Sequence, residues 1–313
     1  MSKPHDTDAD AAGSRLRTVR AVNELRAELA PARREGRRIG LVPTMGALHA
    51  GHLSLIERAR TACDVVVVSL FVNPAQFDEA SDLERYPRQE QRDAQLAARA
   101  GADVLFAPPI EEVYPEGFAT TVDVAGLTDT LEGAARGAAH FRGVATVVTK
   151  LLCMALPDVA YFGQKDAQQV LVIRRLVADL NVPVEIETAP TVREADGLAL
   201  SSRNARLSAQ ERDRALALPA ALDAAHALAA AGERAAGALL EGAREAMRAR
   251  GVEPEYVELA DPVTLEPREQ LDSELLLLVA ARIGATRLID NVTLTPAASE
   301  RPAPRKELVT CSE

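Results

Sequence analysis

The fold of this chain is decided by residues 41–52, which read Leu41-Val-Pro-Thr-Met-Gly-Ala-Leu-His-Ala-Gly-His52. The apolar residues from Ile39 to Val42 predict a buried strand that stops at Pro43. The residues from His52 to Ala62 predict a helix directly after it. The stretch is therefore a strand, a loop and a helix N-terminus, an arrangement that favours bound phosphate.

Two common phosphate-binding signatures, G-x-G-x-x-G and G-x-x-x-x-G-K-[ST], are absent from the chain. In their place, Gly46 and Gly51 allow a ligand to approach the backbone closely, and His49 and His52 lie at the start of the helix. Their imidazole N–H groups can follow negative charge onto a leaving pyrophosphate. The His-x-x-His spacing leaves two alternatives open: a metal site, which would need a third ligand, and two surface histidines without a chemical role.

Apolar strands alternate with helices through the first 190 residues. We expect strands at 65–72, 104–106, 159–162 and 184–187, and helices at 22–35, 89–100, 144–155 and 167–180. This alternation is typical of a parallel sheet covered on both faces, and right-handed crossovers make such a sheet doubly wound. The predicted fold class is therefore α/β, with a Rossmann-like sheet.

The pattern changes after about residue 190. Two alanine-rich helices at 209–231 and 235–250 precede short strands at 256–259, 275–281 and 287–291, which predicts a second, smaller α+β domain. We expect four segments along the chain: a disordered tail over 1–15, the Rossmann-like domain over 16–190, a C-terminal lid domain over 191–295 and a flexible tail over 296–313.

Composition excludes several classes of protein. The 313 residues hold 36 Lys and Arg against 46 Asp and Glu, a net charge of −10, so nothing attracts the chain over long range to nucleic acid or an anionic membrane. Aromatic residues make up 3% and Trp is absent, which counts against a base-stacking surface. Cys63, Cys153 and Cys311 lack metal-ligand or redox spacing. Because no apolar signal core or run of about 20 apolar residues is present, we expect a cytoplasmic protein.

Two further loops follow predicted strands, where ligands bind in open α/β sheets. The loop Phe71-Val-Asn-Pro-Ala-Gln-Phe77 offers Asn73 and Gln76, which could orient a hydroxylated or carboxylated substrate or simply form an Asn-Pro turn. The loop Tyr161-Phe-Gly-Gln-Lys-Asp166 offers Lys165 as a phosphate contact, whereas Asp166 could equally be a helix N-cap.

A fourth loop lies at the predicted domain junction and reads Thr191-Val-Arg-Glu-Ala-Asp-Gly-Leu-Ala-Leu-Ser-Ser-Arg-Asn204. Ser201, Ser202 and Arg203 form a second set of phosphate donors in a loop that could close over a ligand, although the serines could instead cap a helix. No Ser/His/Asp or Cys/His arrangement is present, so we expect no covalent protein intermediate. Three more polar residues, in or before an apolar helix, invite a functional interpretation: His140, Arg142 and Lys150.

With these segments in view, the chain resembles the pantothenate synthetase (pantoate–β-alanine ligase) family over residues 20–293. The resemblance rests on six motifs in order: Pro43-Thr-Met-Gly-Ala-Leu-His-x-Gly-His52, Phe71-Val-Asn-Pro-x-Gln-Phe77, Tyr86-Pro-Arg88, His140-Phe-Arg-Gly-Val-x-Thr-Val-Val148, Gly163-x-Lys-Asp166 and Asp196-Gly-Leu-Ala-Leu-Ser-Ser-Arg-Asn204. The family usually has Arg-Pro-Gly-His-Phe before its Gly-Val helix. Here the sequence is Arg136-Gly-Ala-Ala-His140-Phe141, so Arg136 is left out of the predicted site.

The resemblance implies a two-step reaction. ATP and (R)-pantoate would give an enzyme-bound pantoyl adenylate and pyrophosphate, after which β-alanine would release pantothenate and AMP. The Rossmann-like domain would bind ATP and pantoate, Mg²⁺ would accompany the nucleotide, and the chain would form a homodimer. The alternatives are another adenylyl- or cytidylyltransferase of the same superfamily, which shares the His-x-Gly-His element, and a nucleotide-binding protein without activity.

By motif match, the resemblance also implies the roles of individual residues. His52 would be the acid that assists departure of pyrophosphate, with His49, Lys165 and Arg203 beside it. Gln76 and Gln169 would hold pantoate, Gln76 would also meet β-alanine, and Asp93 matches an acidic position linked to the metal. The implied ATP site consists of Met45, Gly46, Ala47, Leu48, His49, Ala50, Gly51, His52, Gly163, Gln164, Lys165, Asp166, Val192, Leu200, Ser201, Ser202 and Arg203.

Overall fold

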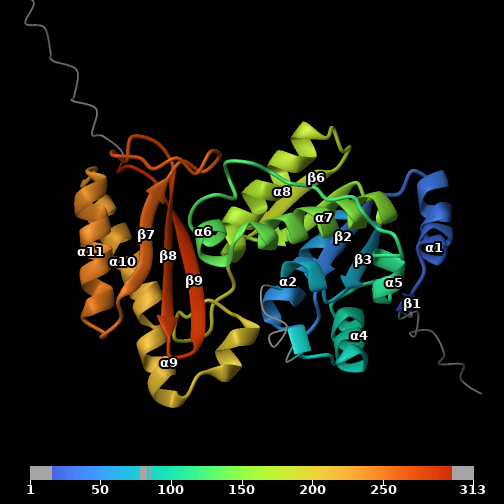
Figure 1. The fold of residues 1–313 in the computed structure, drawn as a ribbon, viewed down its shortest axis with the longest axis horizontal. Helices are drawn as coiled ribbons and strands as arrows, with labels where there is room; N and C mark the ends of the chain where they lie inside the picture. Colours follow the sequence, from blue (N-terminus) through green and yellow to red (C-terminus); the bar gives the residue numbers. More distant parts are fainter. Residues whose placement is uncertain (1–15, 78–82, 85, 298–313) are drawn as a thin grey trace, which may run out of the picture.

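The structure is a computed structural model, and it describes residues 16–77, 83–84 and 86–297. The predicted tail over 1–15, and all but two residues of the predicted tail over 296–313, lie outside the described residues. Two sheets stand side by side with helices around them, and the chain runs from the larger sheet to the smaller one (Figure 1). No helix in the described part of the chain is long and apolar enough to cross a membrane.

The larger sheet has six strands, all parallel, which confirms the predicted doubly wound α/β fold. Its strands, in spatial order, are β1 (Arg17–Val19), β4 (Val104–Phe106), β3 (Val65–Leu70), β2 (Ile39–Thr44), β5 (Val159–Gly163) and β6 (Glu185–Ala189). From β2 the chain winds outward through β3 to β4 on one side, and β5 and β6 follow on the other. The order therefore reverses between β2 and β5, and such a switch point opens a crevice at the carboxyl ends of the strands.

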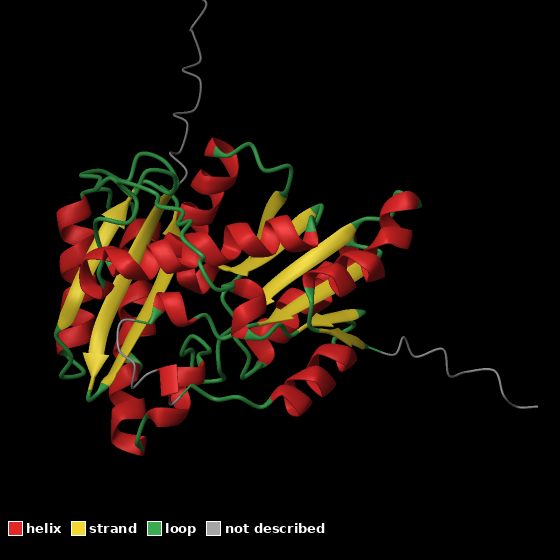
Figure 2. Ribbon diagram, turned by 45° about the vertical axis from the view of Figure 1, so that its right-hand side comes forward, coloured by secondary structure: helices red, strands yellow, loops and turns green. Residues whose placement is uncertain are grey.

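Helices cover both faces of this sheet, as Figure 2 shows. Along β3, Val65 and Val67 pack into one core with α1 (Val22–Arg34), α7 (Ala138–Ala155) and α8 (Ala167–Asp179). Val66 and Val68 pack into the other core with α2 (Ala50–Ala62) and α4 (Glu90–Arg99). The two-residue period of a strand explains why an unbroken valine run serves both faces.

Strand β2 differs from its prediction because it does not stop at Pro43. Pro43 pairs in register with Ser69 of β3, and the strand continues to Thr44. On the β5 side the pairing covers only Gly40 and Leu41. The strand is thus paired on one side only where Pro43 lies, and a residue without an N–H is tolerated there.

Several short elements were not predicted, namely β1, α5 (Ile110–Val113), α6 (Glu132–Arg136) and three 3₁₀ turns, η1 (Pro74–Gln76), η2 (Gln164–Asp166) and η3 (Ser202–Arg206). The helix predicted from residue 144 begins at Ala138, directly after Gly137, which has a φ of +84°. That earlier start places His140 and Arg142 on the helix itself. The new boundary matters because His140 then faces the loop after β3.

The smaller sheet is antiparallel and consists of β7 (Pro254–Ala260), β8 (Leu275–Ile283) and β9 (Thr286–Leu294), in that order. Helices α10 (Ala217–Ala230) and α11 (Ala236–Arg248) pack on one face, while part of the other face joins the core of the larger sheet. The helix predicted over 209–231 is broken into α9 (Ala209–Ala215) and α10, because Pro219 has no N–H to donate to the carbonyl of Ala215.

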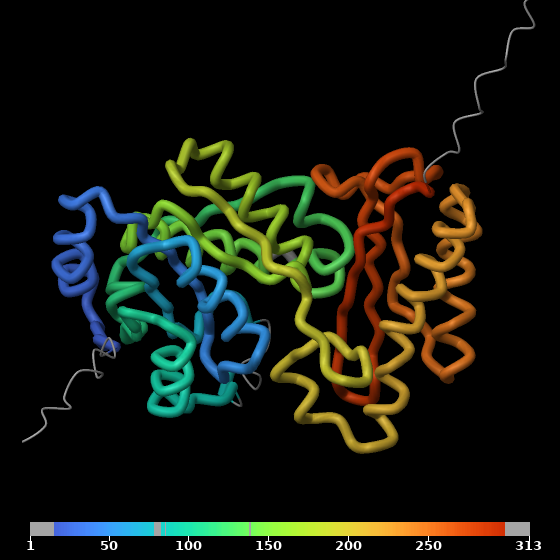
Figure 3. Tube along the Cα trace, turned by 180° about the vertical axis from the view of Figure 1, so that it is seen from behind, coloured from blue at the N-terminus to red at the C-terminus, as the bar shows by residue number. Residues whose placement is uncertain are grey.

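The segment from 190 to 204 connects the two parts, and seen from behind it runs between β9 and the larger sheet (Figure 3). This segment carries the fourth predicted loop. The exact domain limits at 190 and 191 stay a prediction, although the two separate sheets agree with two structural units.

Candidate functional site

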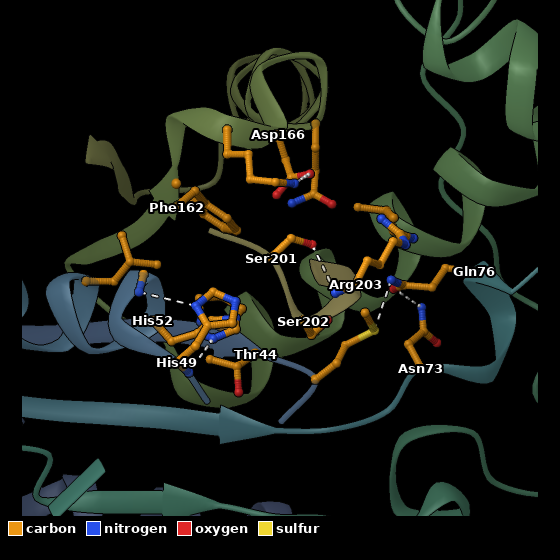
Figure 4. A pocket seen from close by; sticks show the side chains of 18 of the residues that line it. Thr44, His49, His52, Asn73, Gln76, Phe162, Asp166, Ser201, Ser202 and Arg203 are labelled. Atoms are coloured by element: carbon orange, nitrogen blue, oxygen red, sulfur yellow. Dashed lines mark hydrogen bonds and ion pairs between the residues drawn. The ribbon is translucent and has the colours of Figure 1, made fainter. Parts of the chain in front are cut away.

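A cavity of about 300 Å³ lies at the carboxyl ends of β2 and β5, where the strand order reverses. Its wall is formed by the loops after β2, β3 and β5 and by the 190–204 segment, as the close view in Figure 4 shows. Most of the predicted site residues lie in this wall: Met45, His49, Gly51, His52, Gln76, Gly163, Lys165, Asp166, Gln169, Val192, Leu200, Ser201, Ser202 and Arg203. The fold thus brings together four segments that are far apart in the sequence.

The two histidines begin helix α2 and share one hydrogen-bonding pattern. His49 is the N-cap, and its Nδ1 accepts the N–H of Gly51 at 3.2 Å. Nδ1 of His52 accepts the N–H of His49 at 3.4 Å, and the two ring centroids are 4.1 Å apart. Because Nδ1 is the acceptor in both rings, each neutral imidazole carries its proton on Nε2. Each ring therefore has one N–H donor left for a ligand.

Both histidines are uncharged at neutral pH. Burial, and then repulsion from the His49 ring when that ring is protonated, lower the pKa of His52 from 6.5 to about 3. Burial, followed by the positive charge of Lys165, also lowers the pKa of His49. A pair of neutral donors adds no positive charge to the cavity, so the permanent positive charge there comes from lysine and arginine.

Asp93 fixes the loop that precedes the histidines. It is fully buried in the first turn of α4, and its two carboxylate oxygens accept the N–H groups of Ala47 at 2.8 Å and Leu48 at 2.9 Å. The loop turns there through left-handed backbone, with φ of +91° at Gly46 and +52° at Ala47. The predicted metal-linked position is thus engaged with the protein backbone, and a role as metal ligand stays a prediction.

Gln76 is held by a small polar network on the β3 side of the cavity. Its Oε1 accepts from Nδ2 of Asn73 at 2.9 Å, and its Nε2 contacts Sδ of Met45 at 3.1 Å. Asn73 is fully buried and accepts the hydroxyl of Tyr114 at 2.7 Å. The Asn-Pro segment is therefore a turn, η1, whose asparagine orients the glutamine.

Cations gather on the β5 side of the cavity. Nζ of Lys165 lies 3.6 Å from Oδ1 of Asp166, and Arg203 and Arg136 line the same wall. The side chain of Asp166 is 49% exposed, and the positive charges of Lys165, Arg203 and Arg136 lower its pKa. Asp166 is the N-cap residue of α8, as the alternative predicted, but its side chain makes no capping hydrogen bond.

The junction segment closes the wall. Ser201 caps η3, since its Oγ accepts the N–H of Arg203 at 3.2 Å. The capping alternative therefore holds for Ser201 even though it lines the cavity together with Ser202. The N–H of Leu200 bonds to the carbonyl oxygen of Val192 at 2.9 Å and brings these two predicted residues together.

Some predicted residues lie outside the cavity lining. Gly46 packs against Leu70 and Asp93, Leu48 belongs to the hydrophobic core, and the side chain of Gln164 points to β9. The residues outside the lining are Gly46, Ala47, Leu48, Ala50, Gln164 and Asp93. That a ligand contacts the backbone of these six residues stays a prediction.

The lining also contains residues that lie outside the predicted ATP and pantoate sites. Arg136 was excluded because its motif departs from the family, yet it lines the cavity from the end of α6. His140 is buried, and its Nδ1 donates to the carbonyl oxygen of Gln76 at 2.9 Å. Thr44 and Tyr86 complete the wall near the histidines. In the sequence, His140 already invited a functional interpretation, whereas the departure from the family motif led to the exclusion of Arg136.

The described residues contain no group of three His, Cys, Asp or Glu side chains arranged to hold a metal ion. The His-x-x-His pair therefore has no third ligand of these types within the described part of the chain. Asp166 lines the cavity, and its carboxylate is paired with Lys165 at 3.6 Å. These residues do not fit a metal held by protein ligands alone.

Helix-terminal donors and cations at the switch point of a doubly wound sheet define the class of protein as an α/β enzyme that handles nucleotide phosphates. A family model described as Pantoate-beta-alanine ligase matches residues 17–293, and the chain belongs to that family. The resemblance seen in the sequence is thereby confirmed.

Named relatives and solved structures agree with this assignment. Pantothenate synthetase of Cereibacter sphaeroides is 55% identical over 275 residues, which cover 88% of this chain and 98% of that protein. Crystal structures of pantothenate synthetase from Thermus thermophilus (TM-score 0.84, 49% identity, 90% of this chain and 100% of that one) and of pantoate-beta-alanine ligase from Francisella tularensis (0.72, 34%, 88% and 97%) are similar in fold. The latter is complexed with beta-gamma ATP and beta-alanine.

Proposed function

We propose that the enzyme, a pantoate–β-alanine ligase by family, forms its amide bond in two steps in the cavity at the ends of β2 and β5. In the first step, a carboxylate oxygen of (R)-pantoate attacks the α-phosphorus of ATP, and the bond to the β-phosphate breaks. The products are pantoyl adenylate and pyrophosphate. In the second step, the amine of β-alanine attacks the acyl carbon and loses a proton, and AMP leaves. Pantothenate is the product.

One observation carries this proposal: two neutral histidines at a helix N-terminus face a wall that contains Lys165 and Arg203. Negative charge develops on pyrophosphate as the bond breaks, and fixed donors aimed at that charge lower the barrier. We assign His52 and His49 to this task as neutral rings that donate a hydrogen bond through Nε2–H. Because their pKa values are lowered, they are not imidazolium acids at neutral pH. Lys165 and Arg203 supply the positive charge.

The second step depends mainly on position. We assign Gln76 and Gln169 to pantoate, since both line the cavity and Gln76 is oriented by the buried amide of Asn73. Gln76 would also meet the amine of β-alanine. Holding an amine against an acyl adenylate can contribute about 7–11 kcal/mol through effective molarity. No nucleophilic side chain is required for either step.

ATP supplies the adenylyl group, and the Francisella tularensis relative, complexed with beta-gamma ATP and beta-alanine, supports ATP and β-alanine as substrates here. We propose Mg²⁺ only as the ion that accompanies the phosphates, where it would neutralise the charge of the leaving group. A homodimer and a cytoplasmic location are likewise proposals, and light scattering would test the first.

The test of the first step is exchange of labelled pyrophosphate into ATP, with pantoate present and β-alanine absent. We expect exchange that requires pantoate, and we expect H52A to reduce it by about 10²–10³-fold, the effect of one lost charge-stabilising donor. The control is H226Q, an exposed histidine of α10, which should keep wild-type exchange. No pantoate-dependent exchange would contradict the adenylate. A nucleotide that stays joined to its acceptor would instead indicate a nucleotidyltransferase.

A further inference from the structure

The side chain of Asn291 connects the smaller sheet to the turn that carries Lys165. Asn291 lies on β9 and is buried. Its Nδ2 donates to the carbonyl oxygens of Gln164 and Lys165, both at 2.9 Å. Its Oδ1 accepts from Nε2 of Gln164 at 3.2 Å. One amide of the smaller sheet thus holds two consecutive peptide groups of η2, which lies more than a hundred residues earlier in the chain.

The preceding residue on β9 holds the other wall of the cavity. The carboxylate of Asp290 is buried and accepts from Arg193 at 2.6 and 3.0 Å. Arg193 follows Val192 in the junction segment and pairs through its backbone with Ala199. Oδ1 of Asp290 also accepts the N–H of Asn291 at 2.8 Å. Two adjacent residues of β9 therefore bind the segments that line the cavity. Asn291 binds η2, which contributes Lys165, and Asp290 binds the junction segment, which contributes Arg203.

The three side-chain bonds of Asn291 that we identify serve η2 and not the sheet in which it lies. Neighbouring side chains of a strand point to opposite faces, and the next residue, Val292, packs into the core formed with α10 and α11. A buried amide is costly unless it is hydrogen-bonded, and here the partners belong to the turn beside the cavity. The interaction is therefore specific to the placement of η2.

We propose that Asn291 is a positioning residue for Lys165, through which the smaller sheet sets the place of the cation in the phosphate site. The inference rests on the proposed role of Lys165 in binding ATP phosphates. Lysine reaches its partner on a flexible stem, so its charge is delivered correctly only if its backbone is held. Misplacement by about 1 Å can cost about 10²-fold in rate.

The experiment is a double-variant cycle on pantoate-dependent pyrophosphate exchange. N291A, K165A and N291A/K165A are compared with wild type, and V292A is the matched control on the same strand. We expect N291A to lower kcat/KM for ATP at least tenfold while KM for pantoate stays within twofold. In the K165A background, N291A should cause no further loss. V292A should lower the melting temperature but leave kcat/KM for ATP within twofold.

The outcomes separate this inference from the proposed function. If N291A and K165A multiply in the double variant, or if N291A behaves like V292A, Asn291 does not act through Lys165 and the inference is overturned. If K165A itself has no effect, the assigned role of Lys165 fails instead. N291S keeps one donor and replaces N291A if N291A does not fold. A loss in N291S that is smaller than the loss in K165A, and that disappears in the K165A background, would support the inference. A loss that persists in the K165A background would overturn it.

Discussion

Glu132 and Arg287 form a two-pronged ion pair between α6 and β9, with Oε2 2.7 Å from Nη1 and Oε1 2.8 Å from Nη2. Both side chains are largely buried, at 10% and 16% exposure. Tyr256 donates to the same carboxylate at 2.8 Å, and Nε of Arg287 reaches Glu255 at 2.6 Å. The pair joins the segment that carries Arg136 to the smaller sheet.

Removing one partner of this pair should destabilise the protein. We expect R287A to lower the free energy of unfolding in urea by about 3–5 kcal/mol, because it leaves the carboxylate of Glu132 buried and uncompensated. In E132Q/R287A the buried charge is gone, so the loss should be smaller than in R287A alone. The control is R282A, since Arg282 is exposed and pairs with Glu255 only at 3.6 Å; it should change stability by less than about 1 kcal/mol. Equal losses in R287A and R282A would contradict the interpretation.

The two bonds from Asp93 to the backbone of Ala47 and Leu48 lead to a prediction about the histidine loop. In D93N one acceptor becomes a donor and faces a backbone N–H, so we expect a loss of about 1–3 kcal/mol in stability. The misplaced loop should also lower kcat/KM for ATP. The dependence of the rate on Mg²⁺ should keep its midpoint, because the carboxylate acts on the loop. A shifted Mg²⁺ midpoint with unchanged stability would instead identify Asp93 as a metal ligand. D179N, at an exposed aspartate of α8, is the control.

Much of the larger sheet was predictable because its information is local. An unbroken valine run predicts a strand buried on both faces, and helices alternate with such apolar runs. Strands β2 to β6 all appear close to their predicted places. The ends of strands were mispredicted where pairing with another strand, distant in sequence, sets them. Pro43 stays in β2 because of how β5 diverges, and β1 forms only by pairing with β4, whose residues lie far along the chain.

The residues of the candidate site could be predicted where their motifs follow directly after a predicted strand. His49, His52, Lys165 and Arg203 all line the cavity because the fold brings the carboxyl ends of β2 and β5 together. What a motif cannot reveal is how a side chain is used. The carboxylate of Asp93 accepts hydrogen bonds from the backbone of the loop after β2. The contacts from β9 to η2 join residues more than a hundred positions apart.

The buried imidazole of His140 should make stability depend on pH. Burial, followed by the charge of Arg136, lowers its pKa from 6.5 to about 4. The unfolded chain therefore protonates His140 at a higher pH than the folded protein does. The stabilisation that comes from a neutral His140 is fully present above pH 6.5 and is lost as pH falls toward 4. Between pH 7.5 and 5.0 the loss from this group is about 2 kcal/mol.

We expect H140Q, which does not titrate, to reduce the difference in unfolding free energy between those two pH values by about that amount. Urea unfolding at each pH is the measurement, and H226Q, at an exposed histidine, should keep the wild-type difference. An H140Q protein with the wild-type pH dependence would show that His140 is not held neutral by the fold.

Gly143 lets α7 approach the turn that holds Gln76, and this contact gives the last prediction. A Cβ at Gly143 would lie 2.2 Å from the carbonyl oxygen of Ala75 and 2.7 Å from the N of Gln76. The carbonyl oxygen of Gly143 also accepts from Nδ2 of Asn73 at 3.1 Å. Because these neighbours are backbone atoms, the added methyl group must push η1 away from α7.

We expect G143A to lower the free energy of unfolding by about 1–3 kcal/mol through overpacking, although alanine is the better helix former. Displacement of Gln76 should raise KM for pantoate more than KM for ATP. The matched control is G237A in α11, where a Cβ meets nothing within 4 Å and should stabilise the protein by about 0.4–1 kcal/mol. If G143A were as stable as G237A and kept its pantoate KM, close packing of α7 against η1 would not be what orients Gln76.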